Sequence, residues 1–301
     1  MNMKVDLCGV TLNNPVMTAS GTFGSGAEYA EFADLNKLGA VVTKGVANVP
    51  WPGNPTPRVA EVYGGMLNAV GLQNPGIDLF VERDIPFLKQ FDTKIMVNVC
   101  GHSTEEYIEV VERLRDQPVD LLEINISCPN VKEGGIAFGQ DPKAVEAITK
   151  EMKKHAAQPV IMKLSPNVTD ITEMARAAEA GGADGLSLIN TITGMKIDIN
   201  RQKFVLANKT GGMSGPAIHP VAVRMVYQTA QAVKLPIVGM GGIMNAEDAI
   251  EMILAGATAV SVGTANFTNP HVTEEIVAGI KDYMERYQVA DIKDLVGAVH
   301  E

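Results

Sequence analysis

Short apolar runs recur along the chain at fairly even intervals, and each run is continuous rather than alternating with polar residues. Continuous apolar runs of this length are typical of parallel strands, which are buried on both faces of a sheet. We expect eight such strands, at Pro15–Ala19, Ala40–Lys44, Ile95–Val99, Leu121–Ser127, Val160–Leu164, Gly185–Asn190, Pro236–Gly239 and Ala259–Val262.

Segments with helical periodicity separate several of these runs. Side-chain oxygens that can accept from the first backbone N–H groups precede three of the segments, at Ser103, Asp141 and Asn245. Gly181 and Gly256 follow two of them, as is typical of C-terminal caps. The predicted helices are Glu105–Arg115, Pro142–His155, Thr169–Ala180, Pro220–Val233 and Ala246–Ala255.

This alternation of strands and helices predicts an α/β fold, which we interpret as a closed (β/α)8 TIM barrel with active-site loops at its C-terminal face. An open doubly wound sheet is the alternative, but no G-x-G-x-x-G fingerprint follows the first strand. Lys4–Leu12 predicts a small N-terminal β-hairpin that covers the N-terminal end of the barrel, and the Pro-rich Val49–Arg58 predicts an ordered loop. Because no repeat or linker divides the chain, residues 1–301 are expected to form a single domain.

Charge and composition exclude several classes of partner. The net charge of −10 argues against nucleic acid or an anionic membrane surface. No apolar segment approaches the roughly 20 residues of a membrane span, and the opening MNMKVDLCGV does not resemble a signal peptide. The cysteines and histidines show no metal-ligand spacing. We therefore expect a cytoplasmic protein without a metal of its own.

Polar side chains and glycines gather where the predicted strands end. The C-terminal ends of barrel strands meet at one rim, where barrel enzymes build their active sites. Buried polar groups cost free energy unless they are paired or used, so a set of them at one rim indicates function. The set comprises Ser20, Gly21, Lys44, Gly45, Asn98, Asn125, Cys128, Lys163, Ser165, Asn190, Thr191, Gly241, Gly242, Gly263 and Thr264.

Glycines after the last two strands predict a phosphate site. Gly241-Gly242 and Gly263-Thr264 stand where barrels commonly bind phosphate through backbone N–H groups. Glycine lets the backbone approach phosphate oxygens closely. The cluster Gly211–Gly215, expected in the loop after the sixth strand, could add further donors. These donors suit one phosphate monoester, as in FMN or a phosphorylated sugar.

Two lysines and several amides predict what else is bound. Lys44 or Lys163 could stabilise negative charge that develops on a flavin, or could form the Schiff base of an aldolase. The amides favour the flavin, since they offer donors and acceptors that complement a pyrimidine or flavin ring. These amides are Asn68, Asn98, Asn125 and Asn190.

Cys128 follows the fourth predicted strand and could be a nucleophile, a base or a small buried apolar residue. The glycine-rich segment 131–139 comes next and suits a lid that excludes water from the site. Cys8 and Cys100 are interpreted as structural.

Five motifs resemble dihydroorotate dehydrogenases of class 1, and the resemblance extends along essentially the whole chain. They are Thr43-Lys44-Gly45, NAVGLQNPG at 68–76, EINISCPN at 123–130, Asn190-Thr191 and GMGGI at 239–243. The resemblance implies that Cys128 is the base that removes the C5 proton of dihydroorotate while hydride passes from C6 to N5 of FMN. Class 2 members typically carry serine at this position.

The resemblance also assigns binding residues. The implied FMN contacts are Ser20, Lys44, Gly45, Asn98, Asn125, Lys163, Ile189, Gly215, Gly241, Gly242, Gly263 and Thr264. The implied substrate contacts are Lys44, Asn68, Ala69, Val70, Gly71, Leu72, Asn125, Asn190 and Thr191. Ile189 and the apolar members of 68–72 are implied by the resemblance alone.

The stretch NTITGMKID at 190–198 resembles class 1B, the NAD-linked form. The resemblance implies a partner subunit that carries FAD and a [2Fe-2S] cluster and passes electrons to NAD+, within a heterotetramer built on a homodimer of catalytic chains. Three alternatives stay open at this point: the fumarate-linked class 1A, a dihydropyrimidine dehydrogenase-like enzyme, and a Schiff-base aldolase acting on a sugar phosphate.

Overall fold

The computed structural model describes residues 1–126 and 138–300 and contains a closed parallel barrel of eight strands. Each strand pairs with its neighbour in chain order, and the last strand pairs with the first to close the barrel. The strands are β3 (Val16–Thr18), β4 (Ala40–Val42), β7 (Lys94–Val99), β8 (Leu121–Asn125), β9 (Val160–Lys163), β10 (Gly185–Leu188), β15 (Ile237–Met240) and β16 (Ala259–Val262). All eight predicted strands and the TIM barrel are thereby confirmed.

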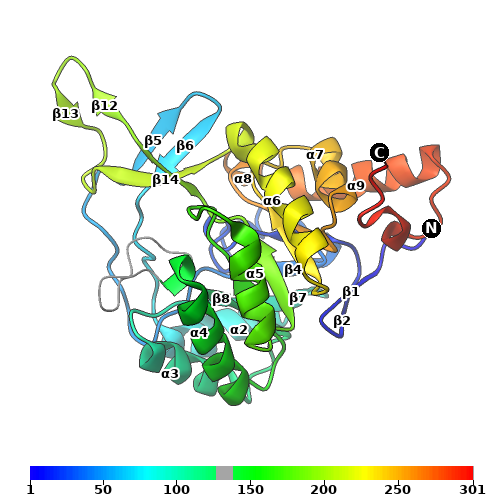
Figure 1. Ribbon diagram of the computed structural model, residues 1–301, viewed down its shortest axis with the longest axis horizontal. Coiled ribbons are helices and arrows are strands. Elements are labelled where there is room, and N and C mark those ends of the chain that lie inside the picture. The colour runs from blue at the N-terminus through cyan, green and yellow to red at the C-terminus, as the bar shows by residue number, and fades with distance from the viewer. Residues whose placement is uncertain (127–137, 301) are drawn as a thin grey trace.

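Helices surround the barrel and pack against one another in chain order (Figure 1). The five predicted helices are confirmed. The three predicted N-caps are confirmed as well, since Ser103, Asp141 and Asn245 accept from the backbone N–H groups of Glu106, Lys143 and Asp248. The helices are α3 (Thr104–Leu114), α4 (Pro142–His155), α5 (Ile171–Ala180), α6 (His219–Ala232), α7 (Ala246–Leu254) and α9 (Val272–Arg286).

Shorter helical segments were not predicted, and neither was α9. Three of them form one continuous stretch between β4 and β7, four are short turns in other connections, and η5 follows α9. Their bounds are α1 (Ile77–Leu79), η2 (Phe80–Asp84), α2 (Ile85–Leu88), α8 (Ala265–Thr268), η1 (Leu35–Lys37), η3 (Phe138–Gln140), η4 (Pro216–Ile218) and η5 (Ile292–Leu295). No helix within 1–126 or 138–300 is long and apolar enough to cross a membrane.

The predicted N-terminal hairpin is confirmed as β1 (Val5–Leu7) paired with β2 (Val10–Leu12). It lies at the N-terminal end of the barrel, where Cys8 packs against the first residue of β10. A Cβ at Gly185 would lie 2.7 Å from the Cys8 sulfur, so glycine permits this close approach. The hairpin therefore closes the end of the barrel opposite the predicted active site.

A second, four-stranded antiparallel sheet projects beyond the barrel and was not predicted (Figure 1). It joins two connections that are far apart in the sequence, and a two-stranded hairpin extends from it. In spatial order its strands are β11 (Ile192–Met195), β14 (Thr210–Ser214), β6 (Gly65–Asn68) and β5 (Val59–Val62), and the hairpin is β12 (Ile197–Asp198) with β13 (Lys203–Phe204).

This sheet corrects one prediction about the glycine cluster. Gly211 and Gly212 lie in strand β14 rather than in a loop, and Gly212 stands opposite Thr193 of β11 and Asn68 of β6. Only Gly215, which follows the strand with φ of 108°, has the left-handed backbone expected of a glycine loop. The cluster thus serves mainly to build the sheet.

Candidate active site

One cavity opens at the C-terminal ends of the barrel strands, between the barrel rim and the projecting sheet. Its volume is about 1390 Å³ when the open mouth is included. Apart from Cys128, every residue to which the family resemblance assigned a binding role lines it, whereas Ser165 of the predicted rim set and Gly211 of the glycine cluster do not. The assigned residues that line it are Ser20, Lys44, Gly45, Asn68, Ala69, Val70, Gly71, Leu72, Asn98, Asn125, Lys163, Ile189, Asn190, Thr191, Gly215, Gly241, Gly242, Gly263 and Thr264.

Cys128 and the predicted lid segment up to residue 137 lie outside the described residues. Asn125, the last residue of β8, lines the cavity. The hydroxyl of Tyr107 on α3 donates to the Asn125 carbonyl at 2.6 Å and so holds this strand end in place.

A buried carboxylate organises the floor of the cavity. Glu123 on β8 is fully buried, and its Oε1 accepts from the Ser187 hydroxyl of β10 at 2.7 Å. Its Oε2 accepts from Asn98 Nδ2 at 2.5 Å and lies 3.4 Å from Lys163 Nζ. Lys163 also donates to Ser20 Oγ at 3.2 Å. Because every partner of Glu123 is a donor, the ionised form satisfies all three contacts.

Glu123 was not singled out as a site residue from the sequence, although a signal existed. It stands inside Leu121–Asn125, a strand in which every residue is buried. A charge in such a strand costs several kcal/mol unless it is paired, so its presence indicates partners on neighbouring strands. The sequence alone could not say that Lys163 and Asn98 are those partners.

The segment Asn68–Leu72 forms one wall of the cavity, and asparagine side chains outside it fix its path. Asn74 is buried, donates to the Leu72 carbonyl at 2.8 Å and accepts from the backbone N–H of Ala47 at 3.1 Å. Asn54 donates to the Ala69 carbonyl at 3.0 Å. These bonds support a backbone with positive φ at Leu72, which an ordinary side chain rarely adopts.

Asn190 and Thr191 come from the end of β10 and face the same cavity. Asn167 holds this segment, since its Nδ2 donates to the Thr191 carbonyl at 3.0 Å and its Oδ1 accepts from the Thr193 N–H at 2.9 Å. A Cβ at Gly212 would overlap the Thr191 hydroxyl, so glycine in β14 lets Thr191 pack against the sheet.

The glycines after β15 and β16 line the cavity and carry backbone N–H groups that have no acceptor among the described residues. Gly241 and Gly242 have φ of 132° and 68°, and both line the cavity together with Gly263. Among the described residues, no acceptor takes the N–H of Gly242 or of Gly263. The Ser261 hydroxyl, also at the cavity, is buried and has no partner among them. Orphan donors of this kind suit the oxygens of a phosphate.

The cavity also suits a planar ring. Apolar side chains such as Ala19, Ile189 and Met240 supply flat contact area, while Lys163 and the amides supply directed polar groups. The fold and this cavity define a (β/α)8-barrel enzyme with its site at the C-terminal ends of the strands.

A sequence model of the family described as dihydroorotate dehydrogenase matches residues 2–284. The chain therefore belongs to the dihydroorotate dehydrogenase family, which is flavin-dependent.

Curated relatives resemble the chain over nearly its whole length. The dihydroorotate dehydrogenase B (NAD(+)) catalytic subunit of Lachnoclostridium phytofermentans is 72% identical over 299 residues, covering 99% of this chain and 100% of that protein. The protein of the same name from Alkaliphilus metalliredigens is 65% identical, covering 99% of each chain.

A solved structure shows the same fold. The crystal structure of a DHODH from Eimeria tenella in complex with ferulenol superposes with a TM-score of 0.81 at 22% identity, covering 99% of this chain and 88% of that one.

Proposed function

We propose that this chain is the catalytic subunit of an NAD-linked dihydroorotate dehydrogenase, which oxidises (S)-dihydroorotate to orotate in pyrimidine biosynthesis. The names of relatives at 53–72% identity support this reaction. The observation that carries it is the single cavity that combines orphan backbone donors at Gly242 and Gly263 with a floor of Lys163 and amides.

The residues present fit FMN. The phosphate would take the N–H groups around Gly215, Gly241, Gly242, Gly263 and Thr264, and the ring system would lie over the floor. That floor is formed by Ser20, Lys44, Gly45, Asn98, Asn125, Lys163 and Ile189. When bound, FMN accepts the hydride that leaves C6 of dihydroorotate.

Lys163 supplies positive charge where the ring gains electrons. A fixed cation beside a site of developing negative charge lowers the free energy of that step. Its contacts with Glu123 and Ser20 hold the ammonium group in one place, so little reorganisation is required during the reaction.

The substrate fits the wall and rim of the same cavity. Dihydroorotate carries a carboxylate and a ring of alternating carbonyl and N–H groups. Lys44 complements the negative charge, and asparagine amides pair with both kinds of ring group. The proposed contacts are Lys44, Asn68, Ala69, Val70, Gly71, Leu72, Asn125, Asn190 and Thr191.

Cys128 is proposed as the base, because it follows Asn125 by three residues in the sequence. Its thiolate takes the C5 proton as the hydride leaves C6, and the electron pair of the C5–H bond becomes the C5=C6 double bond of orotate. Proton and hydride together account for both hydrogens lost.

Several further features are proposed with this function. Electrons pass from the catalytic chain to a partner subunit with FAD and a [2Fe-2S] cluster, and from there to NAD+. The word "subunit" in the names of the relatives supports a partner. A heterotetramer around a homodimer of catalytic chains, a cytoplasmic location and a single domain over residues 1–301 complete the proposal.

The absorbance spectrum of the purified chain tests the function. We expect a yellow protein whose flavin band bleaches when (S)-dihydroorotate is added anaerobically, and does not bleach with dihydrouracil. Bleaching by dihydrouracil instead would indicate the dihydropyrimidine dehydrogenase-like alternative. A colourless protein that borohydride crosslinks to a sugar phosphate at Lys44 or Lys163 would indicate the aldolase.

A further inference from the structure

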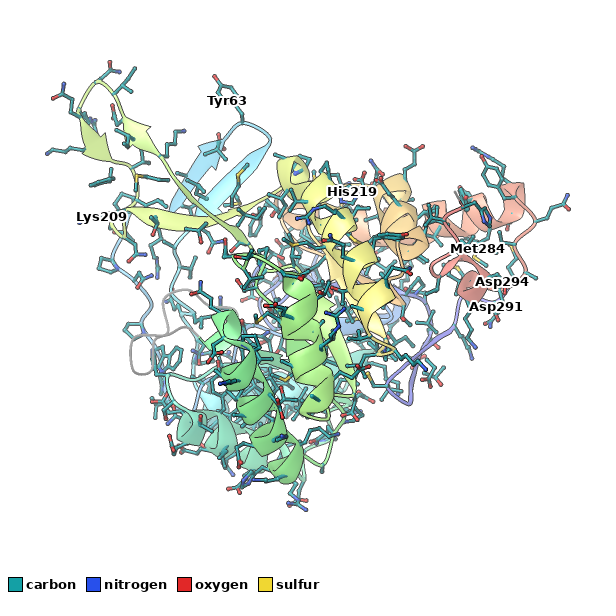
Figure 2. The ribbon with its side chains drawn as sticks, viewed as in Figure 1. Tyr63, Lys209, His219, Met284, Asp291 and Asp294 are labelled. Carbon is teal, nitrogen blue, oxygen red and sulfur yellow. The ribbon has the colours of Figure 1, made fainter. Side chains whose placement is uncertain are left out.

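His219 packs against Gly242 but does not itself line the cavity. It is the first residue of α6 and is 7% exposed, and the neighbouring Ile218 lines the cavity. Its Nδ1 lies 2.8 Å from the Gly241 carbonyl oxygen, and its Nε2 lies 3.2 Å from Glu251 Oε2 on α7. Figure 2 shows His219 among these helices. The side chain therefore connects α7 to the turn that follows β15.

The contact with Gly241 determines where the next N–H group points. The carbonyl of Gly241 and the N–H of Gly242 belong to one planar trans peptide unit, so they point in opposite directions. Because the carbonyl points to His219, the N–H of Gly242 points away from it. Gly242 lines the cavity, and within the described residues its N–H has no acceptor. The N–H of Gly242 is thus directed away from His219, in a residue that lines the cavity.

Both neighbours of the imidazole ring are acceptors. A carbonyl oxygen and a carboxylate oxygen accept hydrogen bonds, so both contacts are satisfied together when both ring nitrogens carry protons. Asp248 Oδ1 lies 4.0 Å from Nε2, and Asp248 Oδ2 accepts from the Met244 N–H at 2.8 Å. His219 therefore contacts the first residue of the turn, Gly241, and Asp248 contacts its last residue, Met244.

We propose that His219 is a positioning residue for the phosphate group of the cofactor. It orients the Gly241–Gly242 peptide through the contact of Nδ1 with the Gly241 carbonyl oxygen. Glu251 and Asp248 keep the ring in this orientation. This inference rests on the proposed function, since it assumes that a phosphate monoester binds at Gly241, Gly242 and Gly263.

Binding of FMN and of riboflavin by the full chain, freed of flavin, tests the proposal. The two ligands share the ring and ribityl chain and differ by the phosphate. His219→Leu is expected to weaken FMN about tenfold, as for loss of one charge-assisted hydrogen bond, and to change riboflavin less than about twofold. His219→Asn is expected to retain most of the FMN affinity, because its amide can donate to the Gly241 carbonyl. Quenching of flavin fluorescence measures each dissociation constant.

His155→Leu is the matched control, because His155 Nδ1 also contacts a carboxylate, Glu112 Oε1 at 2.7 Å, but does not line or support the cavity. It should leave both affinities unchanged. Unchanged FMN affinity in His219→Leu, or an equal loss of both ligands, overturns the inference. If the unaltered chain binds neither flavin, the proposed function fails as well.

Nitrogen NMR of the labelled histidines in the FMN-bound chain gives a second readout, with His219→Asn used to assign the resonances. A protonated Nδ1 supports the hydrogen bond to the Gly241 carbonyl oxygen. An unprotonated Nδ1 overturns the orientation of the peptide.

Discussion

Lys163 Nζ lies 3.4 Å from Glu123 Oε2, and both side chains are buried beneath the candidate active site. Neither charge contacts bulk water, so each depends on the other and on neighbouring hydroxyl and amide groups. The pair therefore does two things: it holds a cation at the cavity floor, and it makes the stability of the barrel depend on that cation.

Glu123→Gln is expected to destabilise the chain by about 3–5 kcal/mol, because Lys163 then stays buried without a counter-charge. The amide also presents an NH₂ group to a site where every partner is a donor. The double variant Glu123→Gln with Lys163→Met should recover part of this loss. Urea unfolding of the flavin-free chain measures both.

Glu146→Gln provides the comparison. Glu146 pairs with Lys150 one turn away on the surface of α4, and such pairs contribute less than about 1 kcal/mol. A stability loss in Glu123→Gln no larger than that in Glu146→Gln would show that the buried pair is not a structural requirement.

Cys128→Ala should retain FMN but lose roughly 10²–10⁴-fold in turnover at neutral pH, the usual contribution of a general base. The reductive half-reaction, followed by anaerobic stopped-flow absorbance, isolates the step in which the proton is removed. Cys8→Ala, at the opposite end of the barrel, should keep normal rates. Turnover of Cys128→Ala close to that of the unaltered chain would refute the assignment of the base.

The Cys8 thiol should remain protonated well above neutral pH. Burial, followed by the negative charges of Asp184 and Asp6, raises its pKa from 9.0 to about 12. Since the unfolded chain releases this proton first, the contribution of Cys8 to stability is complete below about pH 9 and is lost as the pH rises towards 12.

Alkylation by iodoacetamide in a Cys128→Ala background measures this pKa. The rate at Cys8 should still increase about tenfold per pH unit between pH 9 and 11, because only the thiolate reacts. A rate that levels off near pH 9 would mean that the folded chain does not perturb the thiol.

Local sequence determined the barrel strands and five of the six longer helices around them, α9 being the exception. Continuous apolar runs such as Ala259–Val262 and caps such as Asn245 act over a few residues, and both occur in the structure where the sequence predicts them. The rim residues were predictable for a related reason, since parallel strands in one barrel all end at the same face. The family motifs added Ile189 and the apolar members of 68–72, which line the cavity.

Tertiary structure decided the relationships that depend on pairing between distant segments. The projecting sheet pairs β6 with β14, which are separated in the sequence by four of the eight barrel strands. Both strands are short and contain glycine, and neither has an alternating apolar pattern that would reveal it. His219 and Glu123 show the same limit. Their residue types are visible in the sequence, but their roles follow from Gly241 and Lys163, which only the closed barrel brings to them.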